Sequence, residues 1–292
     1  METGQRIVVV GAGGRLGAAL VREYARDFAV VGFNHAQLDL GAPEQLHATL
    51  TDLDFDTLIN AAAQTNVDRC ETQQEEAFAL NAEAPRMLAA ICRAKNARFI
   101  HISTDYVFDG EKREPYSEDD AARPISVYGE SKREGERRVL AEDDGALIVR
   151  VSWVFGPDRP SFIDAILKKA RDEEEISAVA DKYATPTYTI DLCALLKPYL
   201  AERREGGLLH LANEGECSWQ EYAQWALDRC HAEGIPMKAR KVRAVSLSDM
   251  KNFIAKRPVY SVLSSGKYQR ATGETPRHWH DAVADYVRHH VR

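Results

Sequence analysis

The chain has 292 residues, of which 45% are hydrophobic and 28% are charged, so it can bury the core of one large domain or two modest ones. Its net charge of −7 excludes the basic surface expected of a protein that binds nucleic acid or an anionic membrane. Five widely spaced cysteines without a Cys-x-x-Cys pair are typical of reduced thiols. The apolar runs are too short for a membrane span or a signal peptide, so we expect a soluble cytoplasmic protein.

Short apolar runs alternate with helical patterns along the first half of the chain. A β-branched run is followed by glycines and then by a helical pattern, in the order strand, turn, helix. The runs that read as strands are 7–10, 29–33, 57–60, 99–102 and 146–151, and helical patterns cover 16–27 and 75–95. This alternation predicts an α/β fold with a Rossmann-type, doubly wound parallel sheet.

A glycine-rich turn follows the first predicted strand. It contains Gly11, Gly14 and Gly17, with Arg15 and Leu16 between the last two. Glycine permits a tight turn and lets a pyrophosphate approach backbone N–H groups at a helix N-terminus. A glycine turn without a ligand is the alternative, but the position after the first strand of an α/β chain favours nucleotide binding.

The end of the second predicted strand lacks the acid that usually holds the ribose hydroxyls of NAD. Asn34 and His35 occupy that position. Arg15 and His35 can accommodate a 2′-phosphate, which favours NADPH over NADH, although an exposed, unpaired Arg15 fits the sequence equally well. Asp39 and Leu40 follow and are candidates for lining the adenine pocket.

The third and fourth predicted strands are followed by further candidate residues. Ala61, Ala62 and Ala63 offer small side chains where a cofactor would cross the sheet edge, with ordinary helix-start packing as the alternative. Thr104 and Asp105 follow the fourth strand. Ligands of an open parallel sheet bind beyond the carboxyl ends of its strands, so these polar side chains are expected to face the cofactor site.

Tyr128 precedes Lys132 by four residues, a spacing that places both side chains on one face of a helix. A chain of this composition produces such a pair by chance, so the spacing alone does not exclude an incidental tyrosine on a solvated helix. A free tyrosine has a pKa of about 10, and a nearby ammonium would draw that pKa toward neutrality, where proton transfer is efficient.

The glycine turn, Asn60-Ala-Ala, Ser103-Thr104-Asp105 and Tyr128-x-x-x-Lys132 together resemble an extended short-chain dehydrogenase/reductase. The segments INAAAQTNVDRCE, FALNAEAP, HISTDYVFDG, PYSEDD, SVYGESKREGE, RVSWVFG and RPVYSVLSS are closely similar to the dTDP-4-dehydrorhamnose reductase family. The resemblance implies NADPH or NADH as cofactor and a dTDP-4-keto-6-deoxy sugar as substrate. The implied reaction reduces the C4 keto group of dTDP-4-dehydro-6-deoxy-L-mannose to dTDP-L-rhamnose.

The resemblance also implies roles for individual residues. Tyr128 would protonate the developing alkoxide, Lys132 would bind the nicotinamide ribose, and Thr104 would hydrogen-bond the carbonyl oxygen. Asp105 and Trp153 would contact the sugar nucleotide. A core tryptophan stays open as the alternative for Trp153, since large aromatic residues dominate cores.

Two further positions bear on the reaction. Arg257 is a candidate clamp for the diphosphate, with a surface arginine as the alternative. Tyr106 follows the Thr-Asp pair where related sugar-nucleotide dehydratases typically carry a glutamate, which favours simple reduction over elimination.

The sequence leaves alternative functions open. An epimerase is one of them, because epimerases share the Tyr-Lys pair. Reduction of a different nucleotide 4-keto sugar also stays open, as does a non-catalytic NADP-binding subunit resembling the regulatory β subunit of methionine adenosyltransferase.

The pattern becomes less regular after about Trp153. We expect residues 1–155 to form the NAD(P)-binding Rossmann domain, completed by a segment near 186–203, and residues 156–292 to form mainly a smaller sugar-nucleotide-binding domain. The histidines near the C-terminus do not form a convincing ligand set, so we expect no catalytic metal. A homodimer stays open.

Overall fold

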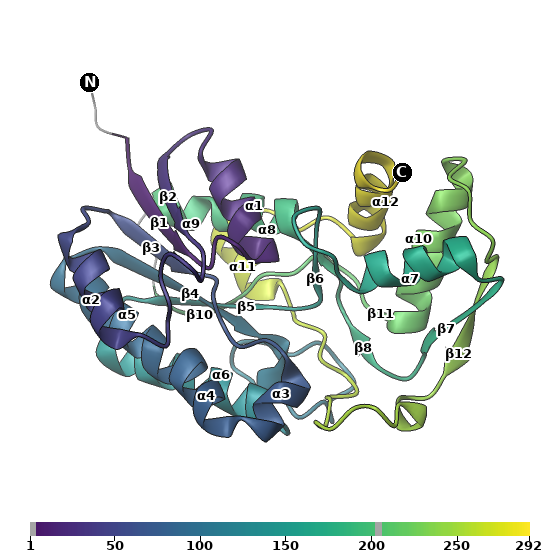
Figure 1. The fold of residues 1–292 in the computed structure, drawn as a ribbon, viewed down its shortest axis with the longest axis horizontal. Helices are drawn as coiled ribbons and strands as arrows, with labels where there is room; N and C mark the ends of the chain where they lie inside the picture. Colours follow the sequence, from purple (N-terminus) through teal and green to yellow (C-terminus); the bar gives the residue numbers. More distant parts are fainter. Residues whose placement is uncertain (1–3, 202–205) are drawn as a thin grey trace.

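The hydrophobic strands pair side by side in one parallel sheet. The structure is a computed structural model that describes residues 4–201 and 206–292. Within these residues, six strands form a sheet in the order β10-β5-β4-β3-β1-β2 (Figure 1). Their bounds are Arg6–Val10 for β1, Ala29–Phe33 for β2, Thr57–Asn60 for β3, Arg98–Thr104 for β4, Leu147–Val151 for β5 and Gly207–His210 for β10. Val10 of β1 lies beside Phe33 and Asn60, so three strands end together at one edge.

Helices cover both faces of this sheet and bury its interior strands β1, β3 and β4. Ile7 and Val9 of β1 pack with one group of helices, whereas Val8 and Val10 pack with the other. The first group is α1 (Arg15–Tyr24), α8 (Thr189–Leu196), α9 (Pro198–Ala201) and α11 (Gly266–Thr272); the second is α2 (Pro43–Asp52), α5 (Ala84–Ala94) and α6 (Val127–Glu142). The predicted α/β fold with a doubly wound parallel sheet is confirmed.

The helix predicted over residues 75–95 is divided in the structure. It consists of α4 (Gln74–Phe78), a π-helical turn η1 (Ala79–Glu83) and α5, preceded by α3 (Val67–Thr72). Asn81 in the π-helical turn accepts the Gln64 N–H at 2.8 Å and donates to the Ser131 hydroxyl at 3.0 Å. Helix α6 approaches so closely that a Cβ on Gly135 would lie 2.1 Å from the Asn81 carbonyl oxygen. These contacts explain why the helix changes its winding here.

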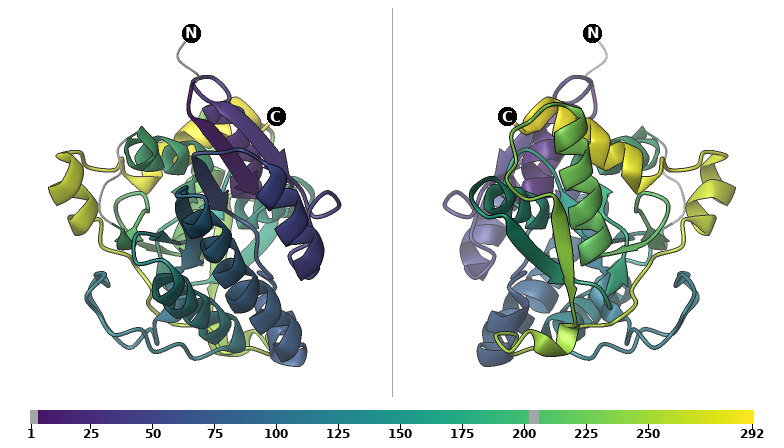
Figure 2. Two further views of the ribbon diagram at one scale, coloured as in Figure 1. Left: turned by 90° about the vertical axis from the view of Figure 1, so that its left-hand side faces the viewer. Right: turned by 90° about the vertical axis from the view of Figure 1, so that its right-hand side faces the viewer.

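A second lobe packs beside the carboxyl ends of the strands. Its elements are α7 (Phe162–Asp172), β7 (Glu175–Val179), α10 (Trp219–Ala232), β12 (Lys241–Val245), η3 (Leu247–Asp249) and α12 (Trp279–His290). Helix α10 lies beside the paired strands β7 and β12 in the right-hand view of Figure 2. The core of this lobe is aromatic, with the rings of Phe155 and Tyr188 stacked 5.2 Å apart.

Short elements connect the two lobes. They are η2 (Asp105–Val107), β6 (Val154–Phe155), β8 (Tyr183–Ala184), β9 (Thr187–Tyr188) and β11 (Cys217–Ser218). The chain then returns to the sheet lobe, where α8 packs on α1 and β10 pairs with β5. Residues 202 and 203 of the expected completing segment lie outside the described residues. The division at residue 155 stays a prediction, while β10 and α11 show that later segments also contribute to the sheet lobe.

Candidate active site

A cavity of about 1060 Å³ opens where β1, β3 and β4 end. This is the expected place for a ligand, since the winding of the sheet reverses between β1 and β3. Fifteen candidate residues from the sequence line it: Gly11, Gly14, Arg15, Leu16, Asn34, Asp39, Leu40, Ala61, Ala62, Ala63, Thr104, Asp105, Tyr128, Lys132 and Trp153. Gly17 and Arg257 are not among the lining residues.

The glycine turn brings the N-terminus of α1 to the cavity. Gly11 has φ +88°, and a Cβ there would lie 2.7 Å from the Ala62 nitrogen. Gly17 packs against the turn, where a Cβ would approach the Gly11 carbonyl oxygen to 2.1 Å, and its contact with a cofactor stays a prediction. No side chain of the described residues caps α1 at Gly14. The turn therefore offers the open cradle and helix N-terminus that suit a pyrophosphate.

Arg15 lines the cavity but is neither exposed nor unpaired. Its guanidinium donates to the carbonyl oxygens of Arg159 at 3.0 Å and Val154 at 3.1 Å, and also to that of Pro160. The unpaired alternative is therefore wrong, and a role toward a 2′-phosphate stays a prediction. Arg159, which the sequence does not single out, also lines the cavity and donates to the Gly13 carbonyl at 2.9 Å.

The end of β2 carries no acid in the structure. Asn34 instead exchanges hydrogen bonds with Gln37: the Asn34 N–H donates to Gln37 Oε1 at 3.0 Å, and the Gln37 N–H donates to Asn34 Oδ1 at 3.1 Å. His35 is exposed, with its Nδ1 3.5 Å from Asp39 Oδ1. Asp39 also accepts the Gly41 N–H at 2.8 Å. Asn34, His35 and Asp39 therefore form a polar rim of the cavity, and a contact with an added phosphate stays a prediction.

Tyr128 and Lys132 lie on the buried face of α6, as the spacing predicts. Ser126 caps the helix by accepting the Gly129 N–H at 3.3 Å. Burial raises the pKa of Tyr128, a hydrogen bond with Thr104 lowers it, and the charge of Asp105 raises it. The causes of this shift do not include Lys132, whose Nζ donates to the Ile102 carbonyl, 2.7 Å away.

Thr104 and Asp105 form a buried polar group beside Tyr128. The Thr104 hydroxyl donates to Asp105 Oδ1 at 3.0 Å. Asp105 Oδ2 accepts from the hydroxyls of Ser261 at 2.6 Å and Ser152 at 3.3 Å. Burial raises the pKa of Asp105, while Lys182 and the two hydroxyl donors Ser261 and Thr104 lower it. The two lobes thus meet at this carboxylate.

Sequence reasoning missed Lys182, which is fully buried near Asp105. Its ammonium donates to the Pro258 carbonyl at 2.7 Å and lies 5.2 Å from the ring centre of Tyr106 and 5.7 Å from that of Trp153. Burial lowers the pKa of Lys182 to about 8. The lysine stands in a polar, loop-like stretch of the sequence, and nothing in the local pattern predicts its burial.

Trp153 joins the cavity to the second lobe. It has φ +36°, its ring lies 5.7 Å from that of Trp219, and its Nε1 is buried without a hydrogen-bond partner among the described residues. An indole N–H in this state is poised to donate to a ligand. Trp153 packs against the core of the second lobe and lines the cavity as well, so both of its expected roles have a structural basis.

Arg257 is not one of the lining residues and forms a paired contact with Asp68 of α3. The Nη2–Oδ2 and Nη1–Oδ1 distances are 2.8 Å and 3.2 Å, and the guanidinium lies 3.6 Å from the ring centre of Phe253. Asp68 also accepts the N–H groups of Ile254 and Ala255, each at 2.9 Å. In this arrangement the guanidinium holds a loop against α3, and a diphosphate contact stays a prediction.

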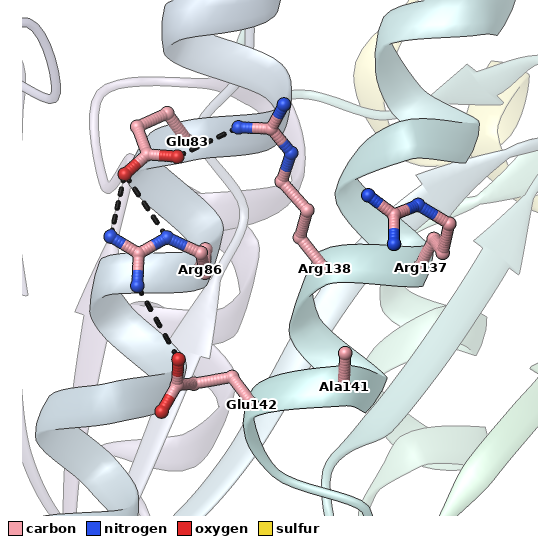
Figure 3. A pocket seen from close by; sticks show the side chains of 6 residues that line it. All are labelled: Glu83, Arg86, Arg137, Arg138, Ala141 and Glu142. Carbon is pink, nitrogen blue, oxygen red and sulfur yellow. Dashed lines mark hydrogen bonds and ion pairs between the residues drawn. The ribbon is translucent and has the colours of Figure 1, made fainter.

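A shallower hollow lies between α5 and α6 on the outer surface (Figure 3). Glu83 pairs with Arg86 and Arg138, and Glu142 pairs with Arg86. The charges are therefore largely neutralised, which is typical of a solvated helix surface. Among residues 4–201 and 206–292, no group of His, Cys, Asp and Glu side chains is arranged to hold a metal ion. No helix in the described part of the chain is long and apolar enough to cross a membrane.

The doubly wound sheet, the glycine cradle and the Tyr128–Lys132 pair at one cavity define a nucleotide-dependent oxidoreductase of the short-chain dehydrogenase/reductase class. Residues 5–292 match the family model described as the RmlD substrate binding domain. The chain belongs to this family, that of the dTDP-4-dehydrorhamnose reductases.

Individual relatives agree with this assignment. The chain is 38% identical over 287 residues to a dTDP-4-dehydrorhamnose reductase of Mycolicibacterium smegmatis, covering 97% of this chain and 85% of the relative. It is 35% identical over 285 residues to a probable dTDP-4,6-dihydroxy-2-methyloxan-3-one 4-ketoreductase of Streptomyces antibioticus, covering 96% and 94%. The crystal structure of dTDP-4-dehydrorhamnose reductase from Bacillus anthracis in complex with NADP is similar with a TM-score of 0.91 and 30% identity, covering 97% and 98%.

Proposed function

We propose that this protein reduces the C4 keto group of dTDP-4-dehydro-6-deoxy-L-mannose to dTDP-L-rhamnose with NADPH or NADH, NADPH being favoured. The observation that carries the proposal is the meeting of the glycine turn, Thr104 and the Tyr128–Lys132 pair at one cavity in a chain of this family. The tight turn at Gly11, where a Cβ would meet the Ala62 backbone, brings the N-terminus of α1 to the cavity, and this position fits a cofactor pyrophosphate. The absence of an acid at the end of β2 supports NADPH.

The chemistry divides between cofactor and protein. A bound reduced nicotinamide supplies hydride to the carbonyl carbon. Thr104 donates a hydrogen bond to the carbonyl oxygen where negative charge develops. Tyr128 protonates that oxygen, and Lys132 binds the ribose hydroxyls and stabilises the phenolate that remains. The buried carboxylate of Asp105 and the unpaired indole N–H of Trp153 orient the sugar.

Tyr106 supports reduction without elimination. Its ring contacts that of Tyr128 edge-on at 5.5 Å, and burial raises the pKa of its phenol. A buried phenol of this kind does not replace the carboxylate with which related dehydratases remove water. The buried Tyr128 and Lys132 also oppose a purely regulatory, non-catalytic protein, since both side chains face the cavity. Reduction of a different nucleotide 4-keto sugar is the second candidate, supported by the Streptomyces antibioticus relative.

The test is a direct assay with purified protein, dTDP-4-dehydro-6-deoxy-L-mannose and either NADPH or NADH. We expect absorbance near ~340 nm, the band of the reduced nicotinamide, to fall, with dTDP-L-rhamnose identified by mass spectrometry and chromatography. No absorbance loss with either cofactor would contradict the proposal. Turnover of another dTDP-4-keto sugar in the same assay would favour the second candidate.

Two broader aspects of the function are also proposals. We infer that the protein works in the cytoplasm, supported by five free, buried cysteines, which suit a reducing compartment. We also propose a homodimer. Light scattering of the purified protein would decide between one and two copies.

A further inference from the structure

The side chain of Lys132 is held by two groups of β4. Its Nζ donates to the Ile102 carbonyl at 2.7 Å and lies 3.2 Å from His101 Nε2. His101 is completely buried, and its ring stacks on Phe99 with centroids 6.2 Å apart. Lys132 is 2% exposed. The contact between these two nitrogens is therefore shielded from water, and the placement of its proton matters.

Asn60 determines which nitrogen of His101 carries a proton. The Ala62 N–H donates to Asn60 Oδ1 at 3.1 Å, which leaves Asn60 Nδ2 facing His101 Nδ1, also at 3.1 Å. An amide nitrogen only donates, so His101 Nδ1 must accept. Turning the amide over would place its nitrogen against the Ala62 N–H, two donors facing each other. The neutral imidazole therefore carries its proton on Nε2.

The Nε2–H of His101 points at Lys132. An ammonium has three donors and no acceptor, so the 3.2 Å contact is a hydrogen bond only when Lys132 is a neutral amine. As an amine, Lys132 still donates to the Ile102 carbonyl and accepts from His101. Protonated, it would place a cationic donor against the imidazole N–H. The Asn60–His101 pair thus discriminates between the two protonation states of Lys132.

The other groups around Lys132 do not cancel the preference of the His101 Nε2–H for a neutral amine. Glu136 favours the ammonium, but its two oxygens are held by Arg150 at 2.8 Å and 2.7 Å. Burial lowers the pKa of Lys132 to about 8, in the direction of the neutral amine. Titratable groups on the elements packed around this site include Tyr128 on α6, Asp105 and Tyr106 on η2, and Cys70 and Glu71 on α3.

We propose that His101, oriented by Asn60, is a positioning residue that disfavours the ammonium of Lys132 before cofactor binds, so that cofactor binding takes up a fraction of a proton at this lysine that grows as the pH rises from about 7 to about 8.5. The inference rests on the proposed function, because the ribose hydroxyls of a nicotinamide dinucleotide are the acceptors that draw the ammonium away from His101. The proton comes from solvent and converts the amine to an ammonium. No other bond changes. The positive charge of the Lys132 ammonium is thereby formed beside Tyr128 when the cofactor binds.

The test is calorimetric titration of the whole protein with NADPH in two buffers of different ionisation enthalpy. With a pKa of about 8 before binding and about 10.4 after it, binding takes up roughly three quarters of a proton at about pH 8.5 and less than about 0.1 at about pH 7. The bound form holds Lys132 as an ammonium, so the affinity for NADPH is highest below about pH 8 and falls as the pH rises. We therefore expect Kd to be about tenfold larger at about pH 9 than at about pH 7. The 2′-phosphate of NADPH titrates near pH 6 and does not contribute.

Two variants separate this effect from simple packing. Asn60→Asp keeps the shape and the Ala62 contact, but its carboxylate accepts from His101 Nδ1–H, which moves the proton away from Nε2. Nε2 then accepts from the ammonium, so proton uptake at about pH 8.5 falls toward zero. His101→Phe removes the donor but leaves Lys132 buried, and burial alone lowers the pKa of this lysine, so the uptake that remains in this variant measures the part due to burial. Lys182→Gln is the matched control, since Lys182 is another buried lysine with a pKa of about 8, and its removal leaves the uptake unchanged.

The outcomes are distinct. Proton uptake that persists undiminished in Asn60→Asp overturns the inference. This variant keeps the shape of the side chain, so it tests the inference even if His101→Phe does not fold. NADPH binding without proton uptake in the wild-type protein also overturns it, while the proposed function stands. Failure to bind either NADPH or NADH overturns the proposed function and this inference together.

Discussion

Tyr128 is a buried phenol that keeps its proton firmly before substrate binds. Burial and the charge of Asp105 raise its pKa, and the hydrogen bond with Thr104 only partly opposes them. Lys132 is not among the causes of this shift, and its Nζ donates to the Ile102 carbonyl. A neutral phenol is the form needed to protonate an alkoxide, so the environment suits the reductive direction.

Removing this phenolic proton tests the residue directly. We expect Tyr128→Phe to lower kcat by about 10²–10⁴-fold, the usual contribution of a positioned acid, while the affinity for NADPH is retained. Stopped-flow or steady-state absorbance of the reduced cofactor measures kcat, and calorimetry measures the affinity. Tyr268→Phe is a matched control, because Tyr268 is buried in α11, outside the cavity. A Tyr128→Phe protein with wild-type kcat would contradict the assigned role.

The sequence reveals some site residues and conceals others for a physical reason. Thr104, Tyr128 and Lys132 stand in local motifs, so spacing and strand order are sufficient to find them. His101 and Lys182 are fully buried, and burial of a histidine or lysine depends on contacts distant in the chain, such as that of Lys182 with Pro258. Arg257 shows the reverse, since its motif is visible but its partner Asp68 is 189 residues away.

At the scale of elements, a buried ion pair fastens α6 to the sheet. Glu136 accepts from Arg150 of β5 through both oxygens, and its Oε1 also accepts the Ser103 hydroxyl of β4 at 2.7 Å. Arg150 is 1% exposed and Glu136 is fully buried. The pair holds in place the helix that carries Tyr128 and Lys132.

Breaking this pair should loosen the helix more than breaking an exposed pair on the same helix. Glu136→Gln leaves an uncompensated buried guanidinium, so we expect the free energy of unfolding to fall by about 3–5 kcal/mol. Glu134→Gln removes the solvent-accessible pairs with Arg137 and Arg138, and we expect a loss below about 1 kcal/mol. Urea denaturation followed by circular dichroism measures both. Equal losses for the two variants would argue against the fastening role of Glu136.

Elements that depend on a local sequence pattern are predicted accurately, whereas those that depend on contacts between distant segments are not. The strands at 29–33 and 57–60 coincide with β2 and β3, because each is a local apolar run bounded by turns. The helix over 75–95 is interrupted by η1, which depends on the long-range approach of Gly135 to Asn81. Two-residue strands such as β8 and β11 arise from pairing between distant segments and leave no periodic signal.

At the scale of the whole molecule, the contact of Asp68 with Arg257 links the loop before β-bridge residue Tyr260 to the sheet lobe. Val67 and Arg69, the neighbours of Asp68, line the cavity. The Asp68 carboxylate therefore holds the loop that carries Arg257 against α3, beside the candidate active site.

Loss of this carboxylate should free the loop. In Asp68→Asn the charge-assisted bonds to Arg257 and to the N–H groups of Ile254 and Ala255 weaken, so we expect faster amide hydrogen exchange there, measured by mass spectrometry. If Arg257 also binds the substrate diphosphate, Arg257→Lys raises the substrate KM more than Asp68→Asn does. Unchanged exchange in Asp68→Asn would rule out the link.

The two lobes are not consecutive along the chain. A fragment of residues 1–155 lacks β10 at the edge of β5 and α8 over α1. It would expose apolar surface, and we expect it to bind a hydrophobic dye or aggregate, whereas the full chain does not. A soluble, cooperatively unfolding fragment that does not bind the dye would instead support residue 155 as a domain boundary.

The return of the chain to the sheet also limits how this enzyme can be recombined with its relatives. A chimera that exchanges everything after residue 155 replaces β10, α8 and α11 as well as the second lobe. Its cofactor half would then be a hybrid, and a change in sugar preference could not be separated from a change in the sheet. Exchange of specificity therefore requires several junctions, placed where the chain passes between the lobes.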